Sequence, residues 1–219
     1  MKTRFIINPI SGTGKQKGIE DYITNNIDDC EIFYTKQAGD AYEITKQAVN
    51  NNIEKVVAIG GDGTVNECLK ALINSKTCLG VIPCGSGNGF ALHIGMKNNI
   101  KEAIKQIKYS KIICIDSCTI NNLPFVNIAG IGFDAHIAKL FSKSKKRGFL
   151  KYVKLILKEL MYDPQEYNIS YNNNKQKFKA YMISIANASE YGNNIQIAPM
   201  ANIQDGLLDF VIVKKFPKW

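Results

Sequence analysis

Three glycine-rich turns, each placed directly after a short apolar run, are the part of this sequence best suited to chemistry. The turn Gly60-Gly61-Asp62-Gly63-Thr64 follows the apolar segment 55–59. Glycine loses more backbone entropy on folding than other residues, so three glycines around one carboxylate favour a loop whose N–H groups must approach a ligand. At a strand-to-helix turn that ligand is typically phosphate, because the free N–H groups of the next helix attract anions.

Asp62 is the unusual member of this turn, since it would place a negative charge beside phosphates. The charge is useful if Asp62 orients the waters of a metal ion, or if it takes the proton of an attacking hydroxyl. We therefore predict that Asp62 is catalytic. The alternative interpretation is an ordinary turn with a chance cluster of glycines.

Two further turns have the same placement. One is 83–89, which contains Ser86 and Asn88; the other is 8–15, which lacks the GxxxxGK[ST] pattern of a Walker A loop. One such turn is weak evidence. Three turns after three parallel strands would meet at one edge of a sheet, where open α/β sheets bind their ligands.

The elements that must position these turns alternate in the first half of the chain. Apolar runs predict strands at 4–8, 31–35, 55–59, 79–83 and 112–115, and helical spacing predicts helices at 17–26, 41–49, 65–72 and 100–107. Strand–helix alternation with short connections predicts a parallel α/β domain over 1–122.

The second half has apolar runs separated by Asn-rich turns. These runs predict strands at 117–120, 123–128, 167–171, 177–186 and 207–213, hence a β-rich domain over 123–219. Segment 139–158 carries eight basic residues and no acidic one, and from residue 149 onward the lysines 151, 154 and 158 share one helical face. A basic amphipathic helix can lie on a membrane surface, or it can bury its apolar stripe in a core.

Composition narrows the class of protein. Lys and Arg outnumber Asp and Glu by 28 to 19 in 219 residues, which suits phosphate, nucleic acid or an anionic membrane, or simply solubility. The six cysteines form no CxxC pair, which argues against a zinc knuckle and for reduced thiols in the cytosol. Without signal peptide, apolar span or base-stacking motif, we expect a cytoplasmic protein, peripheral at the inner membrane face, that does not bind nucleic acid.

Six segments, in the same order and over nearly the whole chain, resemble the catalytic domain of the diacylglycerol kinase family, which includes bacterial lipid kinases and sphingosine kinases. They are NPISG at 8–12, TKQAGDA at 35–41, GGDGTVNE at 60–67, PCGSGNGFA at 83–91, NIAGIGFDA at 127–135 and IAPMANIQDGLLD at 197–209. The GGDGT turn alone is shared with NAD kinases, whereas the set of six is much more specific.

The resemblance implies a Rossmann-like, NAD-kinase-like domain followed by a β-sandwich-like domain, with a cleft between them. It implies nucleotide contacts from Asn8, Pro9, Ile10, Ser11, Gly12, Thr35, Gly61, Asp62, Gly63, Thr64, Val65, Asn66, Glu67, Ser86 and Asn88. It implies a structural Mg²⁺ held by Asp205 and by backbone carbonyls near Asn202 and Leu207, and it places Asp116 with Asp62 as the carboxylates that orient the Mg²⁺ at the phosphates. From residue types alone, Asp205 and Asp116 could equally be turn residues.

The implied activity is ATP- and Mg²⁺-dependent transfer of phosphate to a lipid hydroxyl at the membrane surface, for example that of diacylglycerol or a sphingoid base, by a chain that can form a homodimer. The alternatives are an NAD kinase, or a remnant that binds nucleotide or lipid without turnover.

Two departures from the family pattern bear on this activity. Gly89 stands where the family commonly has Asp, and the sequence ends at Trp219 without the later Asp-Gly-Glu segment that is proposed to contain a base. We therefore expect an incomplete C-terminal domain in which Asp62 is the candidate base.

Overall fold

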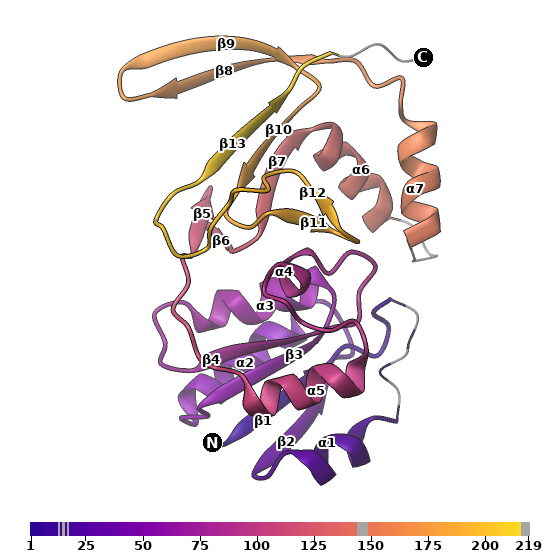
Figure 1. Ribbon diagram of the computed structural model, residues 1–219, viewed down its shortest axis with the longest axis vertical. Helices are drawn as coiled ribbons and strands as arrows, with labels where there is room; N and C mark the ends of the chain where they lie inside the picture. The colour runs from indigo at the N-terminus through magenta and orange to yellow at the C-terminus, as the bar shows by residue number, and fades with distance from the viewer. Residues whose placement is uncertain (13, 15, 17, 144–148, 216–219) are drawn as a thin grey trace.

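A computed structural model describes residues 1–12, 14, 16, 18–143 and 149–215 of the chain. Two bodies lie one above the other in Figure 1, with the N-terminus in the lower body and the last strand in the upper one. Lys17, at the start of one predicted helix, and Lys145, Lys146 and Arg147 of the predicted basic segment lie outside the described residues.

The lower body is built on a parallel sheet of four strands. The strands are β1 (Thr3–Ile7), β2 (Cys30–Tyr34), β3 (Lys55–Gly60) and β4 (Cys78–Pro83), in the order β2-β1-β3-β4. Every residue of β1 is buried, and so is β3 after Lys55, because helices cover both faces of the sheet. The predicted parallel α/β domain is thus confirmed.

Helices cover this sheet in two layers with separate apolar cores. Helices α1 (Glu20–Asn26) and α5 (Ile100–Tyr109) pack on one face, over a core that includes Phe5 and Ile59. Helices α2 (Asp40–Asn50), α3 (Asp62–Leu72) and α4 (Gly89–His93) contribute to the opposite core, which includes Ile6 and Ala58. Alternate residues of the central strands therefore face different cores, which holds the strand ends, and the turns after them, in place.

The predicted strand at 112–115 is wrong. Residues 111–117 have no regular structure, and the side chains of Ile112 and Ile113 are 56% and 54% exposed. This segment carries the chain from one body to the other, where no neighbouring strand is available to pair with it (Figure 1).

The upper body is rich in antiparallel strands, as predicted. Strands β7 (Ile128–Gly132), β10 (Met182–Ala186) and β13 (Asp209–Val213) form a sheet in the order β13-β10-β7. Three hairpins accompany it: β5 (Cys118–Ile120) with β6 (Leu123–Phe125), β8 (Gln165–Tyr171) with β9 (Asn174–Ala180), and β11 (Glu190–Gly192) with β12 (Ile195–Gln196). The domain boundary at residue 122, which falls in the first of these hairpin turns, stays a prediction.

Pairs of asparagines make these hairpins tight. Asn121-Asn122, Asn172-Asn173 and Asn193-Asn194 all have positive φ at both positions, the conformation that two-residue hairpin loops prefer. Two predicted strands proved too long. The run 177–186 is divided between β9 and β10 because the chain changes sheets at Tyr181, and the run 123–128 is divided between β6 and β7.

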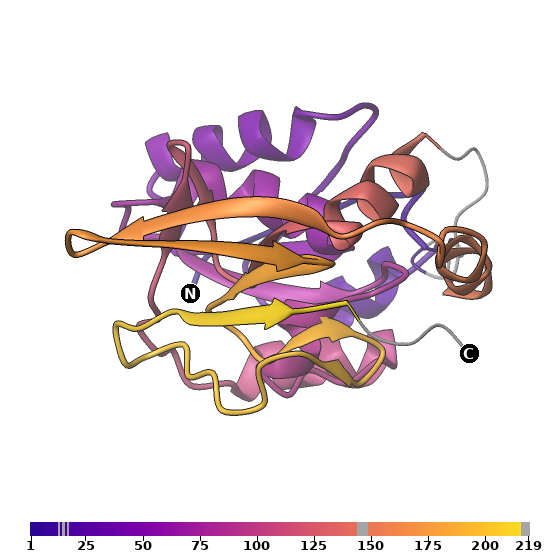
Figure 2. The same cartoon turned by 90° about the horizontal axis from the view of Figure 1, so that it is seen from above.

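Two helices complete the upper body on one side of its strands (Figure 2). Helix α7 (Phe149–Lys158) was predicted, whereas α6 (Phe133–Ser142) was not. They pack over a small core formed by Phe133, Ile137 and Tyr181. No helix in the described part of the chain is long and apolar enough to span a bilayer.

Candidate functional site

A cavity of about 1020 Å³ lies between the two bodies, at the ends of β1, β3 and β4. Its lower wall comes from the three glycine-rich turns and from the segment that follows β2, and its upper wall from α6, α7 and the β11–β12 hairpin. The lower wall contains Asn8, Pro9, Ile10, Ser11, Gly12, Thr35, Gly61, Asp62, Gly63, Thr64, Glu67 and Ser86. The structure thus brings together twelve of the fifteen predicted nucleotide-binding residues.

Close packing of the three turns explains their glycines. A Cβ atom on Gly85 would lie 2.5 Å from the Cα of Gly61, and one on Gly12 would overlap the carbonyl oxygen of Cys84. Backbone therefore meets backbone at this edge of the sheet. The glycines let the turns close on one another beside the first turn of α3, a place that suits phosphate.

Asn8 links the first turn to the second. Its side-chain N–H donates to Thr64 Oγ1 at 3.0 Å, and its Oδ1 accepts from the N–H of Ile10 at 3.2 Å. Gln16, which is fully buried, donates to the carbonyls of Asn8 and Ser11 and so fixes the same turn from below. Sequence reasoning missed Gln16, although an uncharged polar residue inside a glycine-rich turn is a usable signal.

Asp62 links the second turn to the third. It is the first residue of α3, and its Oδ2 accepts from the N–H of Asn88 at 2.9 Å. Burial raises the pKa of the Asp62 carboxyl, and the N–H groups of Asn88, Phe90 and Gly89 oppose that rise. Asp62 can therefore hold a proton at a higher pH than a surface aspartate, in contact with the cavity.

Three of the predicted binding residues do not line the cavity. Val65 is buried in the core between α3 and the sheet, and Asn66 lies beside it on α3. Asn88 instead folds the third turn. Its backbone has φ 62°, its Oδ1 accepts from Gly85 N–H at 2.6 Å, and its Nδ2 donates to the Gly85 carbonyl at 3.1 Å.

The four predicted metal ligands all lie outside the cavity lining, so Asp116 does not join Asp62 there. Asn202, Asp205 and Leu207 are in the loop before β13, and Asp116, in the segment 111–117, contacts that loop. Asp116 Oδ2 accepts from Gly206 N–H at 2.8 Å, and Asp205 Oδ1 accepts from Leu207 N–H at 2.9 Å. Asn202 Oδ1 accepts from Gln204 N–H at 3.0 Å. The described residues contain no group of three or more His, Cys, Asp or Glu that could hold a metal ion.

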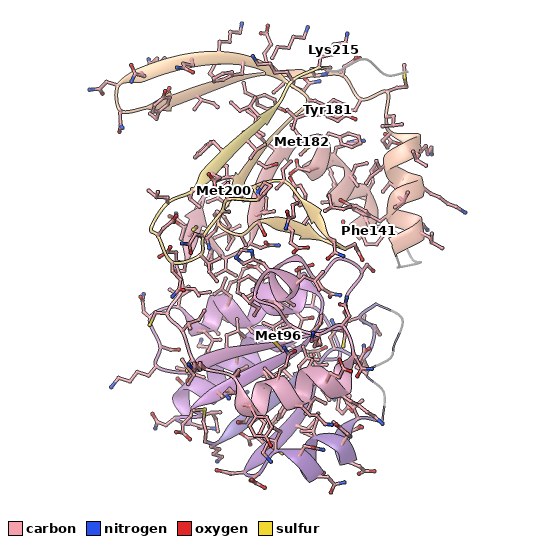
Figure 3. All side chains as sticks on the ribbon, viewed as in Figure 1. Met96, Phe141, Tyr181, Met182, Met200 and Lys215 are labelled. Carbon is pink, nitrogen blue, oxygen red and sulfur yellow. The ribbon has the colours of Figure 1, made fainter. Side chains whose placement is uncertain are left out.

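The upper wall of the cavity was not foreseen from the sequence. It carries Ala138 and Phe141 of α6, Tyr152 of α7, and Tyr191 and Ile195 of the β11–β12 hairpin. Figure 3 places Phe141 at the junction of the two bodies, beside α7, and its ring meets that of Tyr152 edge-on with the centroids 5.4 Å apart. This wall is mostly apolar, and Tyr152 and Tyr191 contribute its phenols.

Tyr191 belongs to a buried polar group. Its hydroxyl donates to Asp134 Oδ2 at 3.0 Å and is also hydrogen-bonded to Ser184 Oγ. Burial raises the pKa of Asp134, and burial together with the charge of Asp134 raises the pKa of Tyr191. Asp134 lies in the segment 127–135 that carries the family resemblance, but the sequence alone gave it no role.

Hydrogen bonds join the two walls at one end of the cavity. The N–H of Asn193 donates to the Gly87 carbonyl at 3.2 Å, and its side chain donates to the Ser86 carbonyl at 2.7 Å. Asn88 and Gly192 form an isolated β-bridge. Nearby, Nδ1 of His93 on α4 accepts from the N–H of Ser189 at 3.2 Å and lies 2.8 Å from its hydroxyl.

Two family models match the chain. The model described as the diacylglycerol kinase catalytic domain matches residues 2–120, and the one described as the YegS C-terminal NAD kinase beta sandwich-like domain matches residues 127–219. The first alone covers more than half of the chain.

Named relatives agree with these models. A "Probable lipid kinase YegS-like" of Chromohalobacter salexigens is 30% identical over 189 residues, which are 83% of this chain and 61% of the relative. One of Klebsiella pneumoniae is 33% identical over 187 residues, 82% of this chain and 63% of the relative. A crystal structure of a diacylglycerol kinase from Bacillus anthracis str. Sterne superposes with a TM-score of 0.75 at 27% identity, covering 97% of this chain and 73% of that one. The chain thus spans about three fifths of the length of the first two relatives.

Proposed function

This chain belongs to the family of the diacylglycerol kinase catalytic domain, and from that membership we propose that it binds ATP in the cavity and phosphorylates a lipid hydroxyl. The observation that carries the proposal is the meeting of three glycine-rich turns, backbone against backbone, at the N-terminus of α3. Such a surface offers N–H donors and a positive helix end to a triphosphate.

The residues of the chain divide the work between binding and proton transfer. Bound ATP supplies the phosphoryl group and, with Mg²⁺, the charge neutralisation that phosphoryl transfer depends on. The turns around Gly12, Gly61 and Gly85 hold the phosphates, and Thr35 and Ser86 lie on the same wall for nucleotide contacts. Asp62 takes the proton of the acceptor hydroxyl, a role that its raised pKa favours near neutral pH.

The donor sets available to Mg²⁺ are carboxylate and carbonyl oxygens, which this ion prefers. At the cavity the candidate is Asp62. Outside the cavity, Asp205 in the loop before β13 and Asp116, which accepts from Gly206 of that loop, are the carboxylate candidates, and the carbonyls of Asn202 and Leu207 belong to the same loop. We assign this loop to a structural ion.

The acceptor is a lipid because the upper wall is apolar. Phe141, Tyr152, Ala138 and Ile195 present hydrocarbon opposite the polar turns. A molecule that fills this cavity must combine a polar head with an apolar body, as a membrane lipid does.

Helix α7 is the element that brings the cavity to the lipid. Its inner face packs through Leu155 and Ile156 on the upper body, and Tyr152 reaches the cavity. Its outer face exposes Leu150 (77%) and Leu157 (61%), followed after the helix by Met161 (77%). Positions 150, 157 and 161 fall within about 20° of one line along a helix with 3.6 residues per turn.

Exposed lysines border that apolar line. Lys151, Lys154 and Lys158 are all exposed, while the nearby acidic Glu159 is turned toward His136 at 3.0 Å. A helix with an apolar stripe beside lysines suits the interface of an anionic membrane. We therefore propose that the protein works in the cytoplasm, at the inner membrane face.

Calorimetry with ATP and Mg²⁺ tests the nucleotide site. We expect wild-type protein to bind, and Gly85→Ala to lose affinity roughly tenfold or more, because the new methyl group forces two turns apart. Asp62→Asn should keep nucleotide binding and lose turnover, which a lipid-panel kinase assay measures. Absence of ATP binding by the folded wild type, or phosphate transfer to NAD in place of lipid, would overturn the proposal.

A further inference from the structure

The upper wall of the cavity holds one hydrogen-bonded polar group, which we call the tyrosine–carboxylate pair: Tyr191 and Asp134, supported by Ser184. Tyr191 lines the cavity, whereas Asp134 lies behind it in the first turn of α6. The three residues come from β11, α6 and β10, so the fold and not local sequence brings them together. The proposed mechanism has no use for this pair.

The tyrosine–carboxylate pair can only accept a hydrogen bond from a ligand, because its O–H group already donates within the pair. The Tyr191 O–H donates to Asp134 Oδ2, so the hydrogen bond between Ser184 and Tyr191 must be donated by Ser184. The other Asp134 oxygen, Oδ1, accepts from the N–H of Ala135 at 2.7 Å. A phenol oxygen can accept a further bond, and its polarisation by the carboxylate makes it a stronger acceptor.

Hydrogen bonds hold Asp134 in place, and burial raises its pKa. Within the described residues no ion pair reaches this carboxylate. The groups whose pKa its charge helps to raise are the phenols of Tyr152, Tyr167 and Tyr191. Gly130 makes room for it, since a Cβ there would overlap Asp134 Oδ2. The hydrogen-bond acceptor that this group presents to the cavity through Tyr191 suits a donor group of a ligand better than it suits phosphate.

The backbone of Tyr191 lies at the end of the cavity where Asp62 lies. A Cβ on Gly87 would be 3.2 Å from the Tyr191 carbonyl oxygen and 3.3 Å from Asp62 Oδ2, so both flank the same glycine. The bonds from Asn193 to Ser86 and Gly87 fix β11 against that turn. A polar head next to Asp62 is therefore next to the strand that carries Tyr191.

We propose that Tyr191, oriented by Asp134, binds a second hydrogen-bond donor on the polar head of the acceptor lipid, a hydroxyl or amine beside the hydroxyl that is phosphorylated. The inference rests on the proposed lipid kinase function. The reacting hydroxyl gives its proton to the base and its oxygen to phosphorus, so it cannot also donate to Tyr191. The favoured class is a lipid with two donors, such as a monoacylglycerol or a sphingoid base, over diacylglycerol or a polyprenol, which have one.

Two short esters isolate the second donor. Glycerol monooctanoate has two hydroxyls and ethylene glycol monooctanoate has one, on the same acyl chain. With Mg²⁺ and a non-hydrolysable ATP analogue bound, calorimetry should show wild-type protein binding the glycerol ester roughly tenfold more tightly, as one charge-assisted hydrogen bond allows. Tyr191→Phe, which keeps the ring, should bind both esters equally, and Asp134→Asn should narrow the difference.

Tyr167→Phe is the matched control. This variant removes a phenol whose pKa is also raised in part by the charge of Asp134 but which does not line the cavity. It should therefore keep the wild-type preference for the glycerol ester. All three variants should bind the ATP analogue like wild type. In a turnover assay Tyr191→Phe should raise KM for glycerol monooctanoate and leave kcat close to wild type, whereas a merely structural role would lower the melting temperature and both affinities together.

The outcomes separate this inference from the function on which it rests. Equal binding of both esters by wild type, no binding of either, or a preference that persists in Tyr191→Phe overturns the role of the pair even where the nucleotide binds. Loss of nucleotide binding overturns the proposed function instead, and titration of the esters without nucleotide then still decides whether Tyr191 discriminates between them.

Discussion

At the scale of single residues, Gly89 shows how one missing Cβ sets the approach of the two bodies. A Cβ there would lie 2.5 Å from the Glu190 carbonyl oxygen and 2.7 Å from both Asn127 Nδ2 and the carbonyl carbon of Tyr191. The aspartate that the family pattern leads one to expect at this position has no room while β11 stays against the third turn. The departure from the pattern is therefore built into the packing of the cavity floor.

Restoring that aspartate should harm the protein. We expect Gly89→Asp to lower the free energy of unfolding in urea by about 2 kcal/mol, as overpacking of backbone does, and to bring no gain in ATP affinity. Gly63→Ala is the control, since nothing lies within 4 Å of a Cβ there and the position is helical. A stable Gly89→Asp protein with tighter ATP binding would show that β11 can move aside.

The residues of the lower wall were predictable because they are contiguous. Asp62 and its glycines form one run, and a strand-to-helix turn has a known relation to anions. Tyr191, Asp134 and Ser184 were not predictable, because up to 57 positions separate the partners and each residue type is ordinary where it stands. Val65 was predicted to bind nucleotide because it belongs to the motif at 60–67, but its position on α3 buries its side chain in the core.

At the scale of elements, α7 carries the prediction about membranes. Changing Lys151, Lys154 and Lys158 to Glu should abolish sedimentation with vesicles of phosphatidylglycerol and phosphatidylcholine, because the helix loses its attraction to anionic lipid. The matched control changes Lys101, Lys105 and Lys108 of α5, which are equally exposed lysines on a helix of the lower body.

Changes of salt concentration and of the apolar side chains of α7 complete the vesicle-binding test. Binding of wild type should weaken as salt rises, and Leu150→Ser with Leu157→Ser should weaken it further at any salt concentration, since both side chains would insert between lipids. Equal loss of binding in the α5 variant would show that net charge, and not α7, directs the protein to the vesicle.

Sequence periodicity predicted the right type of element where a strand and the strands that pair with it belong to the same body. All four strands of the parallel sheet were predicted, β3 most plainly because burial on both faces leaves an unbroken apolar run, and the half-buried edge strand β2 from a shorter run. Residues 112–115 have the same kind of run but no strand to pair with, and α6 begins directly after β7, where Gly132 is the only break between an apolar strand and an apolar helix. Whether an apolar run forms a strand depends on the strands available to pair with it, and these are distant in the sequence.

At the scale of the whole molecule, His93 makes the contact between the two bodies sensitive to pH. Burial lowers the pKa of His93 below its ordinary value of 6.5, although the charge of Glu190 acts in the other direction. The neutral ring accepts from the Ser189 N–H, and a proton on Nδ1 removes that acceptor. The contribution of His93 to stability is therefore present above pH 6.5 and is lost as the pH falls from there through the folded-state pKa.

Urea unfolding between about pH 7.5 and about pH 5 measures this effect. We expect His93→Asn, whose Oδ1 can accept in place of Nδ1, to lose less stability on acidification than wild type does. His136→Asn is the control for removing a histidine and should keep the response of His93. An identical pH profile for wild type and His93→Asn would contradict the prediction.

Association between copies is a property of the whole molecule that stays a prediction. Strand β13, at the edge of its sheet in the described part of the chain, carries Phe210, which is 56% exposed, and Leu208, directly before the strand, is 38% exposed. An edge strand with exposed apolar side chains can pair with another strand. If two copies associate there, sedimentation equilibrium should show a dimer that Phe210→Lys disrupts.

The hydrogen bonds between β11 and the third glycine-rich turn also set how the molecule can move. They join the bodies by backbone at one end of the cavity, while α6 and α7 face the lower body at its mouth (Figure 1). The joined end can therefore act as a hinge, and the mouth at the opposite end is the part that can open. A widening of the mouth that admits a lipid would then move the helices and keep the backbone of Tyr191 beside Gly87 and Asp62.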